Sequence, residues 1–181
     1  MKILLIGGGK SGKSTMAQRL AAALSGDAPR YYWATMTPHD DEDLARIRRH
    51  VADRAPSSEN APALKEQFSG LTRYTLIDAD GTVLFDSVTA CLSEQMFPGP
   101  APDAGAANRV LRELLDISRY LDHFIAVCDD IWHGGEDYRD WTEVYVRGLA
   151  DICQGLAAEF DVVCEMTAGL PHLWKGELPR V

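Results

Sequence analysis

The chain has 181 residues, with 27 Asp and Glu against 18 Lys and Arg, which gives a formal net charge of −9. This length suits a single domain, residues 1–181, that buries a core without disulfides or a structural metal. The 46% hydrophobic and 25% charged composition excludes a disordered chain. The acid excess argues against a nucleic-acid-binding protein, which needs a basic face.

Membrane and secretion signals are not expected. No apolar run approaches the roughly 20 residues that a membrane span requires. The start, Met1–Ile6, resembles a signal peptide until glycines and Lys10 interrupt it. The cysteines form no C-x-x-C pair and are interpreted as reduced thiols of a cytoplasmic protein; they are Cys91, Cys128, Cys153 and Cys164.

Strands are predicted to alternate with helices along the chain. The predicted strands span 2–6, 31–35, 82–86, 124–128 and 162–166, and the predicted helices span 14–24, about 40–52, 107–120 and 142–158. Residues 53–72 are predicted to be a loop with at most one helical turn, and residues 98–106 an exposed connection. This alternation predicts an α/β fold, a three-layer sandwich with a mostly parallel central sheet.

The strongest motif lies between the first strand and the first helix. It reads Gly7-Gly8-Gly9-Lys10-Ser11-Gly12-Lys13-Ser14 and matches the P-loop pattern G-x-x-x-x-G-K-[ST]. Glycines let successive N–H groups face one anion, and the helix that follows adds its positive end. Lys13 would then reach the β and γ phosphates of a nucleotide, and the Ser14 hydroxyl would bind Mg²⁺. The sandwich is therefore predicted to be P-loop NTPase-like.

The uneven charge fits this prediction. Residues 1–30 contain five basic residues and Asp27, a net charge of +4, which leaves −13 for the rest of the chain. An anion site near the N-terminus is therefore compatible with an acidic protein.

A P-loop protein also needs an acid that holds the metal shell. Asp86, at the end of the predicted strand 82–86, is the first candidate, with a helix cap near Val88 as its alternative role. Asp129 and Asp130, after the strand 124–128, are a second candidate pair.

His50 stands out among the five histidines by its context. It ends the predicted helix that carries three arginines, Arg46, Arg48 and Arg49. Strand ends and the P-loop share one edge of an α/β sheet, where basic side chains suit phosphate. An imidazole there would act as a nucleophile on an α-phosphate or as a hydrogen-bond donor, and spacing alone leaves both roles open.

The order of these motifs resembles the bifunctional adenosylcobinamide kinase/adenosylcobinamide-phosphate guanylyltransferase family of cobalamin biosynthesis. That family reads G-G-x-x-S-G-K-S at the P-loop, then A-T, D-D-E, R-I and H. The chain matches with Ala34-Thr35, Asp40-Asp41-Glu42, Arg46-Ile47 and His50. Two later segments, Asp86-Ser87-Val88-Thr89 and Ala168-Gly169-Leu170-Pro171, are also similar to family segments.

The resemblance implies a transferase with two activities. It would phosphorylate adenosylcobinamide and then transfer GMP from GTP through a phosphoramidate on His50, with Mg²⁺ and GTP or ATP. Lys13 and His50 would be catalytic, and Ser14 and Asp86 would bind the metal. Besides Gly7 to Ser14, the resemblance assigns these residues to the nucleotide site: Ala34, Thr35, Val51, Ala52, Asp53, Arg54 and Asp86. A homo-oligomer, a trimer in the family, is also implied.

Three segments depart from the family pattern. Arg54-Ala55-Pro56-Ser57-Ser58 replaces R-P-x-x-W, and the run from Asp129 to Gly135 replaces N-E-V-G-x-G. A late R-D-x-x-G-x-x-N-Q pattern is reduced to Arg147 and Gln154. The acceptor and the preference for GTP or ATP therefore stay open. The alternatives are another P-loop small-molecule kinase without a covalent histidine, and a nucleotide-binding regulatory protein that has lost catalysis.

Overall fold

A central sheet organises the molecule. The computed structural model describes residues 1–36, 65–66, 77–132 and 138–181. The strands are β1 (Lys2–Gly7), β2 (Arg30–Ala34), β3 (Lys65–Glu66), β4 (Thr82–Asp86), β5 (His123–Asp129), β6 (Val162–Thr167) and β7 (Leu170–Lys175). They form a seven-stranded sheet in the order β3-β2-β4-β5-β1-β6-β7, and every neighbouring pair is parallel except β6 and β7.

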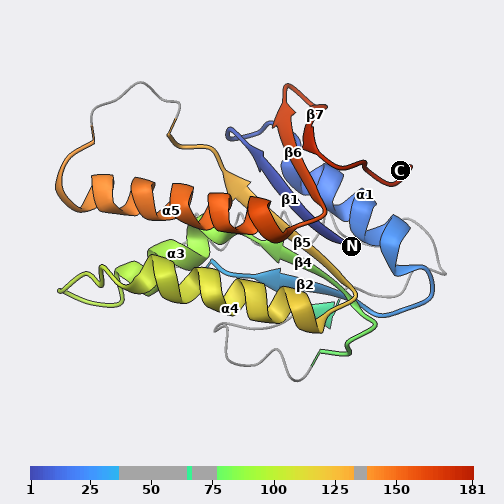
Figure 1. Cartoon of the computed structure of the whole chain (residues 1–181), viewed down its shortest axis with the longest axis horizontal. Helices are drawn as coiled ribbons and strands as arrows, with labels where there is room; N and C mark the ends of the chain where they lie inside the picture. Colours follow the sequence, from blue (N-terminus) through green and yellow to red (C-terminus); the bar gives the residue numbers. More distant parts are fainter. Residues whose placement is uncertain (37–64, 67–76, 133–137) are drawn as a thin grey trace.

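Helices cover both faces of this sheet (Figure 1). They are α1 (Lys13–Ser25), α3 (Val88–Met96), α4 (Ala106–Tyr120) and α5 (Asp140–Glu159). Helix α1 packs on one face, and α3, α4 and α5 pack on the other. The predicted α/β fold with a mostly parallel sheet is confirmed.

Successive side chains of a strand point to opposite faces of the sheet, and this alternation explains the two cores. In β1, Leu4 belongs to the core under α3, α4 and α5, whereas Ile3 and Leu5 belong to the core under α1. Because successive strand residues point to opposite faces, a strand covered by helices on both sides must be apolar throughout. The four residues from Ile3 to Ile6 satisfy that requirement.

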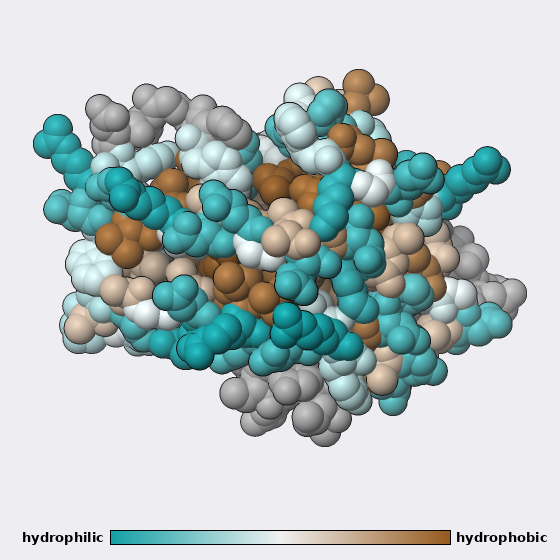
Figure 2. Space-filling view, viewed as in Figure 1, coloured by the Kyte–Doolittle hydropathy of each residue, from teal (hydrophilic) through white to brown (hydrophobic). Residues whose placement is uncertain are grey.

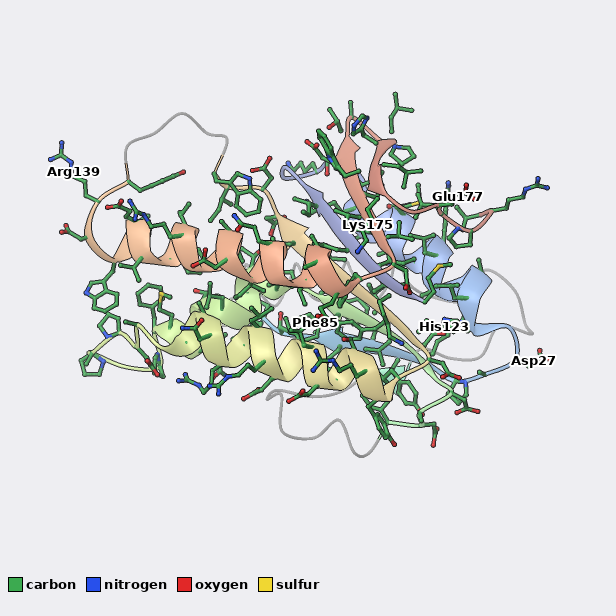
Figure 3. The ribbon with its side chains drawn as sticks, viewed as in Figure 1. Asp27, Phe85, His123, Arg139, Lys175 and Glu177 are labelled. Atoms are coloured by element: carbon green, nitrogen blue, oxygen red, sulfur yellow. The ribbon has the colours of Figure 1, made fainter. Side chains whose placement is uncertain are left out.

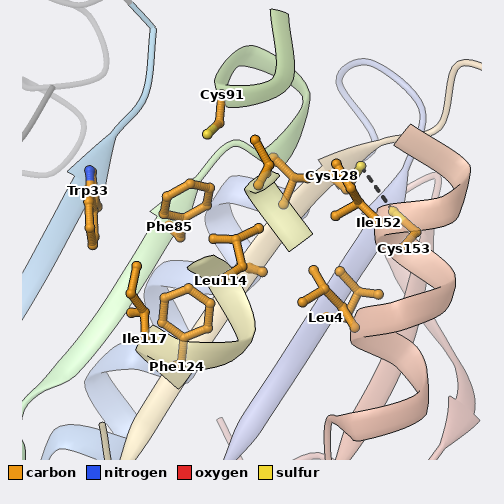
Figure 4. Packing of buried hydrophobic residues seen from close by; sticks show 14 of the residues in the cluster. Leu4, Trp33, Phe85, Cys91, Leu114, Ile117, Phe124, Cys128, Ile152 and Cys153 are labelled. Carbon is orange, nitrogen blue, oxygen red and sulfur yellow. Dashed lines mark hydrogen bonds between the residues drawn. The ribbon is translucent and has the colours of Figure 1, made fainter. Parts of the chain in front are cut away.

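Aromatic side chains cross the larger core from β2 toward α5 (Figure 4). Trp33 meets Phe85 edge-on at 5.5 Å between ring centroids, and Phe85 lies 6.0 Å from Phe124. Phe124 then meets Phe160 at 6.0 Å, nearly perpendicular. Each such pair adds about 0.5–1.5 kcal/mol beyond its burial. The rings therefore tie β2, β4 and β5 to the end of α5.

The predicted boundaries agree with the structure to within two residues for the strands and helices that both contain. Two elements were missed, α3 and β7, and β3 at Lys65–Glu66 corrects part of the predicted loop 53–72. Strand β7 contains Pro171 and is exposed at all six residues, so it has neither the apolar run nor the alternation of a buried strand. The predicted helix at about 40–52 lies outside the described residues.

The antiparallel strand β7 closes one edge of the sheet as a hairpin with β6. Ala168 and Gly169 have φ of 51° and 83°, the left-handed pair that a tight type I′ turn requires. Trp174 donates from Nε1 to Glu165 Oε2 at 3.0 Å across the hairpin. Leu170 at the tip is 71% exposed, and hydrophobic surface emerges over β6 and β7 at the upper right of Figure 2.

The helices of the described segments contain none that is both long and apolar enough to cross a membrane.

Lys175 caps helix α5 from the neighbouring strand (Figure 3). Its Nζ donates to the carbonyls of Ala157 and Ala158, both at 3.0 Å, where the helix leaves acceptors without intrahelical donors. Lys175→Met keeps the aliphatic stem and removes the charge, so we expect it to lower the free energy of unfolding by about 1 kcal/mol. Urea denaturation measures this. The control Arg180→Met should change stability by less than about 0.5 kcal/mol, and equal losses in both variants would contradict the cap.

Candidate functional site

The loop between β1 and α1 lines a small pocket. Residues Lys10 to Thr15 line a cavity of about 240 Å³. Helix α1 begins at Lys13, so its first N–H groups open toward this cavity. Gly12 has φ of 96° and Lys10 has φ of 59°, and such left-handed residues turn N–H groups inward. The predicted P-loop segment is thus a turn between a strand and a helix, an arrangement in which backbone N–H groups can face an anion.

Lys13 is buried and fully hydrogen-bonded. Its side chain is 6% exposed, and Nζ donates to the carbonyls of Gly7 and Gly8, both at 2.7 Å. Nζ also pairs with Asp129 Oδ1 at 2.9 Å. A lysine ammonium has three N–H donors, so these acceptors use all of them.

Ser14, the next residue, faces a different carboxylate. Its Oγ lies 3.4 Å from Asp86 Oδ2, at the end of β4. The same oxygen accepts a hydrogen bond from the buried Tyr32 hydroxyl at 2.9 Å. Asp86 is not the cap of the following helix, because Ser87 takes that place and accepts from the Ala90 N–H at 3.2 Å.

The order of strands explains why two acids meet the P-loop. Neighbours in the sheet run β4-β5-β1, and all three are parallel. Asp86 and Asp129 therefore end their strands at the same edge as Gly7, the place where ligands bind in such sheets. Of the three acids that the sequence offered for the metal shell, Asp86 lies beside Ser14 and Asp129 lies beside Lys13.

Thr35, the residue that follows β2, supports the backbone at Asp86. Its Oγ1 donates to the Ser87 carbonyl at 2.7 Å and accepts from the Ser87 N–H at 2.8 Å. Its own N–H donates to the Asp86 carbonyl at 3.1 Å. Ala34 lies opposite Asp86 in the register of β2 and β4. The A-T dipeptide thus fixes the backbone that holds the carboxylate.

A second network supports Asp129. The Asp129 N–H donates to Thr89 Oγ1 at 2.8 Å, and Tyr145 donates its hydroxyl proton to the Thr89 carbonyl at 2.8 Å. Burial raises the pKa of Tyr145 well above its usual value, so this phenol stays a donor at neutral pH. The hydrogen bond with Cys153 and burial both raise the pKa of Cys128, so it remains a thiol. All four cysteines are free and buried.

The β6–β7 hairpin packs against the P-loop. Gly169 donates its N–H to the Ser11 carbonyl at 3.0 Å. A Cβ on Gly12 would lie 3.4 Å from the Gly169 Cα, and a Cβ on Gly7 would lie 2.4 Å from the Met166 carbonyl oxygen. The sequence did not predict that this segment lies at the site. The only signal was the similarity of Ala168–Pro171 to a family segment.

The structure brings together only part of the predicted site. The P-loop, Ala34, Thr35 and Asp86 gather at one edge of the sheet, whereas His50 and the run Val51-Ala52-Asp53-Arg54 lie outside the described residues. Tyr32 was missed, because a tyrosine in an apolar strand gives no sign that its hydroxyl reaches an acid. Within the described ranges, no three His, Cys, Asp or Glu side chains gather as a metal cluster.

Comparison with known proteins identifies the family. The profile of the cobinamide kinase/cobinamide phosphate guanyltransferase family, CobU, matches residues 3–173. The chain belongs to this family. It is therefore a member of a transferase family of cobalamin biosynthesis.

The chain is similar to two curated proteins named for adenosylcobalamin biosynthesis. The bifunctional adenosylcobalamin biosynthesis protein CobP of Pseudomonas aeruginosa is 29% identical over 178 residues, 98% of this chain and 99% of the relative. The bifunctional adenosylcobalamin biosynthesis protein CobU of Salmonella typhimurium is 35% identical over 98 residues, 54% of this chain and 51% of the relative. The similarity to CobP spans the whole site.

Solved structures support the fold alone. The flagellar accessory protein FlaH of Methanocaldococcus jannaschii superposes with a TM-score of 0.54 at 14% identity, over 97% of this chain and 78% of that one. A second solved structure, an ATPase domain, gives a TM-score of 0.51 at 12% identity, over 91% of this chain and 68% of that one. The P-loop NTPase-like architecture predicted from the sequence is thereby confirmed.

Gly7 offers a direct test of the packing between hairpin and P-loop. Gly7→Ala would force a Cβ within 2.4 Å of the Met166 carbonyl oxygen, a backbone atom that cannot rotate away. We expect a loss of about 2 kcal/mol in unfolding free energy without nucleotide, measured by urea denaturation. The matched control is Gly9→Ala, where a Cβ meets nothing within 4 Å. Equal stability of the two variants would refute the close contact.

Proposed function

We propose that this chain phosphorylates adenosylcobinamide and then transfers GMP from GTP to the phosphorylated product through a covalent intermediate on His50. Membership of the CobU family over residues 3–173 supports the two reactions. The observation that carries the nucleotide part is the pairing of Lys13 with Asp129 and of Ser14 with Asp86. These contacts orient the side chains of Lys13 and Ser14, two successive residues that line the P-loop pocket.

Phosphoryl transfer needs positioning and stabilisation of charge more than covalent chemistry from the protein. The N–H groups of residues 10–15 and the Lys13 ammonium would hold the phosphates of GTP or ATP. The acceptor hydroxyl attacks the γ-phosphorus and loses its proton to solvent, and the bond to the β–γ bridging oxygen breaks. The leaving nucleoside diphosphate keeps the electron pair, and Lys13 would stabilise the charge that develops on it.

Ser14 and Asp86 suit Mg²⁺. Hydroxyl and carboxylate oxygens are its preferred ligands, and it keeps several waters while bound by one or two protein groups and the phosphates. The Ser14 Oγ and the Asp86 Oδ2 lie 3.4 Å apart on adjoining elements, which fits shared binding of one hydrated cation. When bound, Mg²⁺ would neutralise phosphate charge at this edge of the sheet.

His50 would carry the second reaction. A neutral imidazole nitrogen attacks the α-phosphorus of GTP, the bond to the pyrophosphate oxygen breaks, and a phosphoramidate forms. An oxygen of adenosylcobinamide phosphate then attacks the same phosphorus and releases the histidine. Val51, Ala52, Asp53 and Arg54 follow His50 directly and are proposed to lie near the guanine nucleotide.

Family membership and composition also support proposals on domain number, oligomeric state, nucleic-acid binding and cellular compartment. We propose one domain, residues 1–181, assembled as a homo-oligomer, a trimer by family resemblance, with no nucleic-acid partner. The net charge of −9 supports the absence of a nucleic-acid surface. The four free, buried cysteines support a reducing compartment, the cytoplasm.

Radiolabelled GTP tests the covalent step. With GTP labelled at the α-phosphate, we expect protein-bound label that is acid-labile and alkali-stable, as a phosphoramidate is. His50→Ala should remove this label completely. The matched control is His172→Ala, an exposed imidazole on β7 that contacts Trp174, and it should keep the label.

Other outcomes point to the alternatives. If label never appears but the γ-phosphate of ATP or GTP passes to adenosylcobinamide, the protein is a kinase without the covalent histidine. If nucleotide binds without either transfer, catalysis has been lost. The replaced segment from Asp129 to Gly135 is the feature that favours testing both alternatives.

Tyr32 provides a test of the metal ligands. Tyr32→Phe removes the hydrogen bond that orients Asp86 Oδ2 and keeps the ring in the core. We expect the Mg²⁺ concentration for half-maximal phosphoryl transfer to rise about fivefold, the equivalent of about 1 kcal/mol. Tyr120→Phe, on the exposed end of α4, is the control. An unchanged Mg²⁺ requirement in Tyr32→Phe would count against metal binding by Asp86.

A further inference from the structure

Asp129 occupies the third hydrogen-bonding position of the P-loop lysine. Lys13 Nζ donates to the carbonyls of Gly7 and Gly8 and pairs with the Asp129 carboxylate at 2.9 Å. A phosphate oxygen that reaches Lys13 must share or replace one of these contacts, because an ammonium has three donors. The carboxylate is the acceptor with the same charge as the phosphate.

The backbone that carries the Asp129 carboxylate is held in place beside the P-loop, while its side chain is 41% exposed. The Asp129 N–H is bonded to Thr89 Oγ1 at 2.8 Å, and the next N–H, of Asp130, donates to the Gly7 carbonyl at 2.9 Å. Asp129 also lies opposite Gly7 in the register of β5 and β1. The backbone is therefore fixed to α3 at Asp129 and to the P-loop at Asp130.

Geometry sets the distance between the two negative charges. Two acceptors on one tetrahedral ammonium, each at an ordinary hydrogen-bond length, lie about 5 Å apart. Like charges at that distance near a protein surface repel strongly enough to change affinity by about tenfold. A divalent cation at Ser14 and Asp86 would offset this repulsion, since it adds positive charge on the neighbouring side of Lys13.

We propose that Asp129 is a specificity-determining residue that makes the P-loop select nucleotides complexed with a divalent cation over free nucleotides. Asp86 favours the complexed form by helping to bind the cation, and Asp129 disfavours the free form by charge. The inference rests on the proposed nucleotide and Mg²⁺ site.

Calorimetric titration with ADP tests the inference without turnover. The dissociation constant is measured in excess EDTA and in excess MgCl₂, for the native protein and for Asp129→Asn. The ratio of the two constants reports the preference for the complexed nucleotide. We expect Asp129→Asn to reduce this ratio about tenfold, chiefly because free ADP binds more tightly.

Two further variants separate charge from shape. Asp129→Glu keeps the negative charge and should keep a ratio close to that of the native protein. Asp116→Asn makes the same chemical change in an exposed ion pair on α4 and should leave both constants unchanged. Folding of each variant is confirmed by its unfolding transition.

The inference is overturned if Asp129→Asn leaves the ratio within twofold of the native value, if it weakens binding in EDTA, or if Asp129→Glu behaves like Asp129→Asn. Failure of the proposed metal site has a different signature. Asp86→Asn should weaken binding in MgCl₂, and no loss of affinity in MgCl₂ would refute that site. If neither ADP nor GDP binds the native protein under any condition, both proposals are refuted.

Discussion

The buried charge of Lys13 is the constraint on which the site depends. An ammonium that is 6% exposed must find acceptors, because an unpaired buried charge costs several kcal/mol. The Gly7 and Gly8 carbonyls meet that demand only because the loop folds back over the start of α1. The third acceptor comes from β5, a distant part of the sequence. One side chain thus holds the loop closed and fixes it to the sheet.

That arrangement is available only because β5 lies between β4 and β1. The parallel order places the ends of three strands side by side, and the helices that cover both faces leave this edge as the place where polar groups gather. The aromatic series from Trp33 to Phe160 packs β2, β4 and β5 together on the face of the sheet that α3, α4 and α5 cover. Core packing and site geometry are therefore two consequences of the same strand order.

The sequence predicted the features that depend on short stretches of chain. The P-loop follows from eight consecutive residues, and the apolar runs around Leu4, Phe85 and Ile125 are long enough to show buried strands. Contacts between distant segments were not predictable. Nothing local to Asp129 or Tyr32 shows that one meets Lys13 and the other meets Asp86, because both contacts require the strand order. Strand β7 was missed because an exposed edge strand with Pro171 has no apolar pattern.

The hairpin contact with the P-loop has a consequence for the order in which the protein is made. Strand β1 and the loop after it are synthesised before both neighbouring strands, which end at Asp129 and Thr167, and before Gly169, which bonds to Ser11. Of the described strands, β1 leaves the ribosome first. Both of its edges stay unpaired until more than a hundred further residues have been synthesised. Such pairing between distant segments slows folding. The nascent chain has its phosphate loop early but can complete it only after the hairpin has been synthesised.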